Sequence, residues 1–370
     1  MTISRQKVRV AAMVIVALLV LLSPSIAWRL QKARTLEVVI VDKTVPFPKY
    51  REHAAIPWIL HAMKIRGAAG GFLDPAHDYV GFDPRAKVGH DVTAAALEHA
   101  DALVVTDTYG VYRGDYERPG DEAALERSPK IYGGLTTDEA DAIDAFVKRG
   151  GLLIGEFNTF ASPTEPPARA HMERIFGARW TKWVARYWPD LQDEREVPRW
   201  VGRVWERITH TPFSMKGGGL VMVREDEDIV VLLDGEDLGS EVVTQQRTPK
   251  GAEFDFPDHG AFRFWMDVVE PIDGEVLYDH VIATKPPGDK KLADHGLARR
   301  FPALLRRGSA WYFAGDFVDN TIELGSPELA GALAWRQRTS GCGPGSSSEE
   351  TLFWGFYVPI VTRIFASRAR

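Results

Sequence analysis

The sequence predicts an α/β fold in which a mainly parallel sheet is flanked by helices, with a β-rich insertion or flank and an N-terminal apolar helix. Several short runs are apolar at every position, as strands covered on both faces are. Helix signals separate these runs, and parallel strands need such crossover connections. A series of strand patterns divided by turn signals then occupies residues 219–284.

An export segment is predicted at the N-terminus. Basic residues precede an uninterrupted apolar run at residues 10–22, which is the secretory pattern. Residues 25–27 fit a cleavage site, yet the run extended to Trp28 reaches the ~20 residues that cross a bilayer. Residues 1–34 are therefore either a signal anchor, with a single pass through the cell membrane and the soluble part outside the cytoplasm, or a cleaved signal of a secreted or periplasmic protein.

Four apolar runs should be strands of one sheet, and polar residues follow each run: residues 36–41, 103–106, 152–155 and 311–314. The helix before the third run has a capping-box pattern from Thr136 to Glu139 and ends at Lys148-Arg149-Gly150. Further helices are predicted from Pro57 onward and at residues 91–99, 168–176, 327–338 and 352–366. The last is apolar nearly all round, but Pro359 and its short length indicate burial and not a second span.

The pattern divides the chain beyond residue 34 into three parts. Residues 35–179 and 301–370 form two pieces of an α/β core, and residues 180–300 form an aromatic and β-rich insertion or flank. Tryptophans are dense from Trp180 to Trp205. They suit stacking on sugar rings, with Arg186 binding a carboxylate, or alternatively they pack an irregular flank of the sheet.

Composition excludes several classes of function. The net charge of −6, with 45 basic and 51 acidic residues in mixed order, offers no basic stripe, so no nucleic-acid partner is expected. The single cysteine, Cys342, rules out an intrachain disulfide and CxxC metal sites, and the ten histidines have no metal-binding spacing. No cofactor and no metal are expected. Neither a G-x-S-x-G elbow nor a phosphate-binding loop occurs.

Polar residues at the strand ends are the candidate site, because the carboxyl ends of parallel strands meet at one edge of a sheet, where ligands bind. The alternative for each is a turn cap or an ion pair. The predicted catalytic residues are Glu156, Asp316 and His53. The predicted ligand-binding residues are Asp42, Lys43, Glu52, Asp107, Thr108, Tyr109, Asn158 and Arg186.

The order of these elements resembles a class I glutamine amidotransferase-like domain, the flavodoxin-like group that includes ThuA-like proteins of exported bacterial families. The features that carry the resemblance are the strand at residues 36–41, the Asp107-Thr108-Tyr109-Gly110 junction, the helix, Gly-Gly and strand unit at residues 138–156, and the strand at residues 312–316. In such glutaminases the turn after the third strand bears a nucleophilic cysteine. Here it bears Glu156, Phe157 and Asn158, so thioester chemistry is not expected.

Three functions remain open. The favoured one is an extracytoplasmic domain that binds a polar small molecule, such as a glycan, in a pocket at the carboxyl edge, in cell-envelope or exopolysaccharide biology. The second is a hydrolase with glycosidase-like acid and base chemistry, in which Glu156 works with Asp316, Asp42 or Asp107. The third is a non-catalytic scaffold. We favour the first function because the polar residues at the strand ends predict a pocket but include no evident nucleophile.

Overall fold

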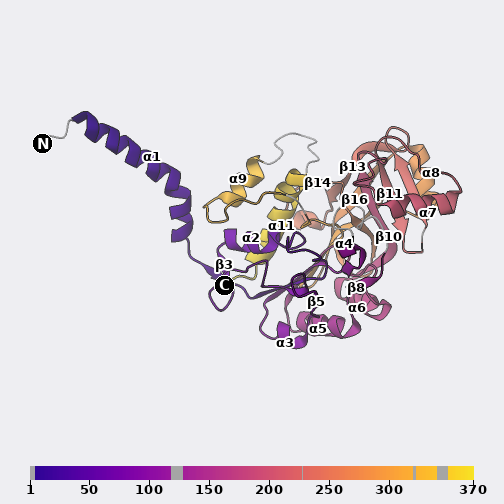
Figure 1. Ribbon diagram of the computed structural model, residues 1–370, viewed down its shortest axis with the longest axis horizontal. Coiled ribbons are helices and arrows are strands. Elements are labelled where there is room, and N and C mark those ends of the chain that lie inside the picture. The colour runs from indigo at the N-terminus through magenta and orange to yellow at the C-terminus, as the bar shows by residue number, and fades with distance from the viewer. Residues whose placement is uncertain (1–4, 118–127, 227, 320–321, 340–348) are drawn as a thin grey trace.

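The computed structural model describes residues 5–117, 128–226, 228–319, 322–339 and 349–370 (Figure 1). Its centre is a ten-stranded sheet with the order β14-β13-β16-β17-β18-β9-β6-β2-β4-β5. In chain order its strands are β2 (Val38–Asp42), β4 (Val80–Asp83), β5 (Val88–Gly89), β6 (Ala102–Asp107), β9 (Leu152–Gly155), β13 (Leu238–Arg247), β14 (His259–Phe262), β16 (Glu275–Thr284), β17 (Arg300–Arg307) and β18 (Ala310–Phe313).

The four predicted core strands are consecutive in this sheet, as β18, β9, β6 and β2, and each pairs with the next in parallel. This part of the fold prediction is confirmed. The sheet as a whole is mixed rather than mainly parallel, because β14, β13, β16 and β17 extend it with antiparallel pairs and β5 pairs antiparallel with β4. Short turns join β17 to β18 and β4 to β5, whereas longer segments join the other antiparallel strands, so the apolar patterns alone do not reveal that these strands continue the parallel core.

A second sheet of four antiparallel strands has the order β12-β11-β10-β15. Its strands are β10 (Ala178–Trp188), β11 (Gly219–Arg224), β12 (Ile229–Leu233) and β15 (Met266–Pro271). Residues 180–300 therefore supply strands to both sheets. In the tryptophan-rich segment, Trp180, Trp183 and Trp188 lie on β10, which has a register shift between Trp180 and Trp183, and Trp200 and Trp205 lie on α7. Two further pairs are β1 (Arg34–Thr35) with β3 (Ile65–Arg66) and β7 (Val111–Tyr112) with β8 (Lys130–Tyr132).

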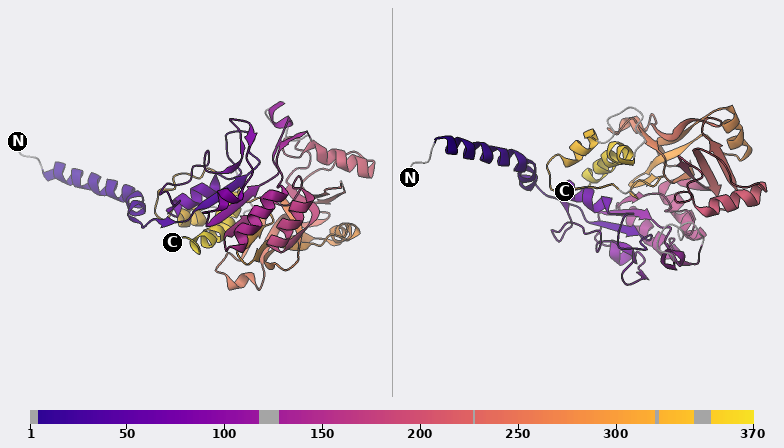
Figure 2. Two further views of the ribbon diagram at one scale, coloured as in Figure 1. Left: turned by 90° about the horizontal axis from the view of Figure 1, so that it is seen from below. Right: turned by 45° about the horizontal axis from the view of Figure 1, so that its top comes forward.

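Helices cover both faces of the large sheet (Figure 2). One face packs on α3 (Ala94–Leu97), α5 (Thr137–Lys148) and α6 (Pro166–Phe176), and the other on α2 (Ala55–Ala62) and α11 (Val358–Ala366). The remaining helices are α1 (Arg5–Leu30), α4 (Gly114–Glu117), α7 (Arg199–Thr209), α8 (Pro286–Asp294), α9 (Ala332–Thr339), α10 (Glu349–Leu352), the 3₁₀ turn η1 (Gly251–Glu253) and the π-turn η2 (Phe353–Tyr357).

Local signals set several boundaries. The capping box of α5 is present, with Thr136 accepting from the N–H of Glu139, and α6 ends at Gly177 with φ 66°, a left-handed conformation that suits glycine. Several predicted boundaries were wrong. The helix α2 begins two residues before Pro57, since the first turn of a helix does not need that N–H. The helix α3 is shorter than predicted at both ends, with Thr93 as the N-cap that sets its start, and α9 begins at Ala332 and not at residue 327.

The C-terminal helical segment is buried, as predicted. It runs continuously through α10, η2 and α11, and Trp354, Tyr357 and Ile360 are completely shielded from solvent. Pro359 lies in the first turn of α11, where its missing N–H costs nothing. Among the described residues, the apolar stretch long enough to cross a membrane is Met13–Leu30 of α1, with a mean hydropathy of 2.1.

Candidate functional site

A cleft of about 950 Å³ lies between the carboxyl edge of the large sheet and the second sheet. The loops after β2, β6, β9 and β18 form one wall, and β10 and β11 form the other. Six predicted site residues line it: Glu52, Asp107, Tyr109, Asn158, Arg186 and Asp316. They come from four loops and one strand of the second sheet, which brings them together although they span more than half of the sequence.

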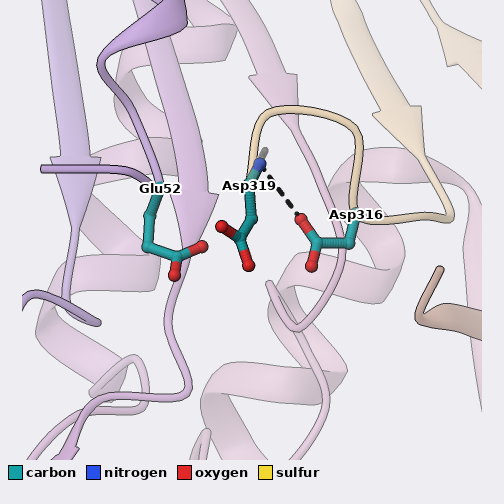
Figure 3. Close-up of side chains that lie close together, drawn as sticks. All are labelled: Glu52, Asp316 and Asp319. Atoms are coloured by element: carbon teal, nitrogen blue, oxygen red, sulfur yellow. Dashed lines mark hydrogen bonds between the residues drawn. The ribbon is translucent and has the colours of Figure 1, made fainter. Parts of the chain in front are cut away.

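Three carboxylates form the centre of the first wall. Oxygen atoms of Glu52, Asp316 and Asp319 lie within 4.8 Å of one another (Figure 3). The N–H of Asp319 donates to Asp316 Oδ1 at 3.3 Å, which folds the loop after β18 so that both side chains face Glu52. The guanidinium of Arg51 donates to Asp319 Oδ2 at 2.8 Å. The carboxylate cluster consists of these three acidic residues together with Asp107.

The carboxylate cluster holds its protons more tightly than isolated carboxyl groups do. Burial raises the pKa of Glu52 and of Asp316 well above the ordinary range, and the neighbouring Asp319 raises both further. Burial also raises the pKa of Asp107 to about 8, against a hydrogen bond from the N–H of Tyr109. Burial likewise raises the pKa of Asp319, while Arg51 opposes that shift. Raised pKa values in adjoining buried carboxyl groups that line a cleft are typical of functional sites.

The same cluster bears on metal binding. Within the described residues, Glu52, Asp316 and Asp319 are close enough to share one ion, and hard divalent cations prefer such oxygen ligands. Sequence analysis predicted no metal and did not select Asp319. The available signal was that Asp319 follows the same apolar run as Asp316, three residues later in the chain.

Aromatic rings continue the cleft beyond the carboxylate cluster. Trp265 stacks between Phe157 and Trp200, with ring centroids 6.3 Å apart and interplanar angles of 13° and 17°. All three residues line the cleft. Arg186 lies 5.8 Å from the Trp265 ring and pairs with Glu196 at 3.2 Å. This aromatic column is formed by residues from a loop, a helix and a link between strands, so sequence periodicity does not reveal it.

Asp42 and His53 do not reach the cleft. Both side chains are fully buried, and His53 Nδ1 lies 2.5 Å from Asp42 Oδ2 while Nε2 donates to the carbonyl of Pro75 at 2.7 Å. The pair ties the end of β2 to the segment that precedes α2. Because both ring nitrogens are engaged inside the protein, the structure does not support His53 as a catalytic residue facing a ligand.

Lys43 and Thr108 are also internal. Lys43 Nζ contacts Glu139 Oε2 at 2.6 Å, the carbonyl of Gly134 at 2.9 Å and Asp91 Oδ1 at 3.0 Å. Thr108 Oγ1 donates to the carbonyl of Asn158 at 2.7 Å. These contacts hold loops of the carboxyl edge to one another and to the start of α5. Both side chains therefore hold the loops that form the cleft in place and do not line the cleft themselves.

Glu156 lies below the carboxylate cluster and not on its surface. Its side chain is completely buried and accepts the hydroxyl of Tyr357, and burial raises its pKa to about 8. Sequence analysis predicted Glu156 as a catalytic residue of the strand-end site, but its side chain is buried and does not line the cleft. Tyr357, in η2, lies 201 positions further along the chain, beyond the reach of a local pattern.

Asn158 reaches the cleft through a strained turn. Its φ is 65°, in the left-handed region, and its N–H donates to the buried Asp267 Oδ2 at 3.1 Å. The hydroxyl of Tyr312 donates to the same oxygen at 2.5 Å, and burial raises the pKa of Asp267 to about 7. Asp267, on β15, was not predicted. It joins the second sheet to the turn after β9 and so fixes the two walls of the cleft.

Comparison with known proteins finds similarity of fold at low identity. No protein-family model matches the sequence, and no curated protein sequence is significantly similar to it. A glutamine amidotransferase from Thermotoga maritima is 10% identical, with 90% of this chain and 95% of that one covered and a TM-score of 0.36. A ThuA-like protein from Bacteroides uniformis is 11% identical, with 86% and 97% covered and a TM-score of 0.36.

A β-galactosidase from Bacillus circulans is 12% identical, with a TM-score of 0.34; 77% of this chain is covered but only 30% of that enzyme. The turn after β9, Glu156-Phe157-Asn158, has no cysteine, and Cys342 lies outside the described residues.

Proposed function

We propose that the folded part of this chain is a binding domain that holds a polar, hydroxyl-rich ligand, such as a glycan, in the cleft. The observation that carries the proposal is the pairing of two surfaces in one cleft: the carboxylate cluster on one side and the aromatic column of Phe157, Trp265 and Trp200 beyond it. Ring faces stack on the apolar face of a sugar, and carboxyl oxygens accept its hydroxyl groups.

The acidic character of the carboxylate cluster determines which kinds of sugar we expect the cleft to bind. Glu52, Asp107, Asp316 and Asp319 crowd one end, with Arg51 as the basic partner of Asp319. Because burial and mutual repulsion raise the pKa values of these carboxyl groups, an anionic group beside them would oppose their ionisation further. A protonated amine would instead favour an ionised carboxylate, and neutral hydroxyl groups bond to either form. Neutral and amino-sugar oligosaccharides are therefore the preferred ligands, and uronic acids are disfavoured at this end.

Calorimetric titration with neutral, amino-sugar and uronic-acid oligosaccharides tests the proposal. Asp316→Asn and Trp200→Ala should each weaken binding of the best ligand by at least about tenfold, which corresponds to ~1.4 kcal/mol. The matched controls are Asp255→Asn, whose side chain is 93% exposed, and Trp335→Ala, which does not line the cleft. Equal affinity for wild type and both cleft variants would show that the ligand binds elsewhere.

A second candidate is a hydrolase, and the spacing of the cluster favours it. The oxygens of Glu52, Asp316 and Asp319 are within 4.8 Å, nearer to the ~5 Å spacing of retaining glycosidases than to the roughly 6.5–9.5 Å of inverting ones. The acid and base would then be cleft residues, since Glu156 and Asp42 are buried. Release of product from the bound oligosaccharide, with a bell-shaped pH profile that Asp316→Asn abolishes, would establish turnover.

For localisation, we propose that α1 is retained as a single-pass anchor with the folded domain outside the cytoplasm. The support is that α1 continues to Leu30 without a break and that Trp28, directly after the predicted cleavage site, is only 4% exposed because it packs on the domain. A fusion of residues 1–34 to a reporter active only outside the cytoplasm should be active and remain in the membrane fraction. Recovery of active reporter in the soluble fraction would instead indicate cleavage.

A further inference from the structure

The apolar helix α1 is joined rigidly to the domain at its C-terminal end. Lys64 Nζ donates to the carbonyls of Arg29 and Gln31, each at 2.6 Å, and of Trp28 at 2.8 Å, and the lysine is only 5% exposed. These carbonyls belong to the end of the helix, where no intrahelical donor remains, and a cation there is favourable. The direction of α1 is therefore set by the domain and not by a flexible linker.

A second contact lies further along α1. The N–H of Ala330 donates to the carbonyl of Pro24 at 2.9 Å, and the segment that contains Ala330 leads directly into α9. Pro24 precedes Arg29 by five residues, which is about 7.5 Å along a helix axis. Figures 1 and 2 show α9 beside the C-terminal end of α1. This part of the domain thus reaches past Arg29 toward the apolar stretch of the helix.

The residues around this second contact expose apolar side chains. Trp335 on α9 is 67% exposed and Leu329 is 40% exposed, and Ile26 on α1, two residues after Pro24, is 43% exposed. No side chain of α9 is fully buried, although Leu333 packs on the core cluster and Arg336 lies over the Trp354 ring, so Trp335 is left on the outer side of the helix. The charged Glu328 at its base is paired with His61 at 3.4 Å. We define the α9 face as Leu329 together with Trp335.

We infer that the α9 face is a second membrane contact, placed in the headgroup layer of the bilayer that α1 crosses. The inference rests on the proposed anchoring by α1. The helix positions Arg5 and Pro24 are about 28.5 Å apart along the axis of α1, close to the ~30 Å thickness of the hydrocarbon core, so we place these two levels at opposite edges of the core. Ala330, which bonds to Pro24, then lies at one edge of the core, and Arg29 lies about 7.5 Å further out, so the α9 face is in the interfacial layer. Tryptophan prefers this layer, where its ring is apolar and its N–H is hydrated.

Two contacts with one bilayer fix the orientation of the domain. Figure 1 shows that β10, β11 and α7, which lie at the second wall of the cleft, are at the end of the domain opposite α1. The second wall of the cleft therefore lies on the side of the domain away from the membrane.

Spin labelling of the full chain tests the inference. The intact chain, with Cys342→Ser as background, is placed as one copy per nanodisc of phosphatidylcholine and phosphatidylglycerol, and nitroxides are attached through Trp335→Cys or Leu329→Cys. Collisions with oxygen, which partitions into lipid, are compared with collisions with a water-soluble nickel complex. We expect the oxygen-to-nickel ratio at both positions to exceed by several-fold the ratio at Ile208→Cys on α7, a residue that is 46% exposed and far from α1.

A label at Val16→Cys, within the apolar stretch of α1, separates two kinds of failure. A lipid-embedded signal at position 16 together with a nickel-accessible signal at positions 329 and 335 overturns the α9 contact but keeps the anchor. An aqueous signal at position 16 overturns the anchor and, with it, the inference. With one copy per disc, shielding of position 335 cannot come from a second chain.

Discussion

Replacement of Lys43 by methionine should destabilise the fold without changing the affinity of the folded protein for ligand. The ammonium contacts Glu139 at 2.6 Å, and both side chains are 1% exposed. Removing one partner of a buried pair leaves an uncompensated charge, which costs about 3–5 kcal/mol. Glu139 keeps hydrogen bonds from the N–H groups of Val92 and Thr136, so the lower end of this range, about 3 kcal/mol, is expected.

Urea unfolding measures this loss, provided that the slope against denaturant is unchanged. The matched control is Lys148→Met, which removes an ion pair with Asp144 in which the lysine is 74% exposed, and should cost less than about 0.5 kcal/mol. A loss below about 1 kcal/mol for Lys43→Met would refute the buried pair. Weakened ligand binding per folded molecule would restore the prediction that Lys43 contacts ligand.

Two further predictions concern Glu156 and Thr136. Burial raises the pKa of Glu156 from 4.5 to about 8, so the folded state binds a proton that the unfolded state has released. The stability that this bound proton contributes is complete below about pH 4.5 and is lost as pH rises toward 8. Glu156→Gln has no such proton to release and keeps an acceptor for Tyr357. Between pH 5 and pH 8, urea titrations should therefore show a smaller loss of stability for Glu156→Gln than for wild type. An equal loss in both proteins would mean that Glu156 is ionised in the fold. Thr136→Ala should cost about 1 kcal/mol through loss of the capping box of α5, while the exposed Thr137→Ala should change the unfolding midpoint little; equal effects would contradict the cap.

The site shows how far strand-end reasoning extends. Glu52, Asp107, Asn158 and Asp316 were selected because each follows an apolar run, and the structure brings all four to one cleft. The rule places a residue near the carboxyl edge, but it does not say whether the side chain points outward. Asp42 and His53 satisfy the same rule and face each other in the interior.

The sequence by itself determined the elements whose causes are local. The four core strands, the capping box of α5 and the buried C-terminal segment follow from apolar runs, capping residues and proline, each acting within a few positions. Only the tertiary structure decided which polar residues face solvent. Tyr357 covers Glu156, Asp267 holds Asn158 from another sheet, and Trp265 completes a column with Phe157. These contacts join residues more than 100 positions apart in the sequence. Burial and packing over such separations depend on how the sheets and helices assemble, and no periodic pattern of the sequence encodes that assembly.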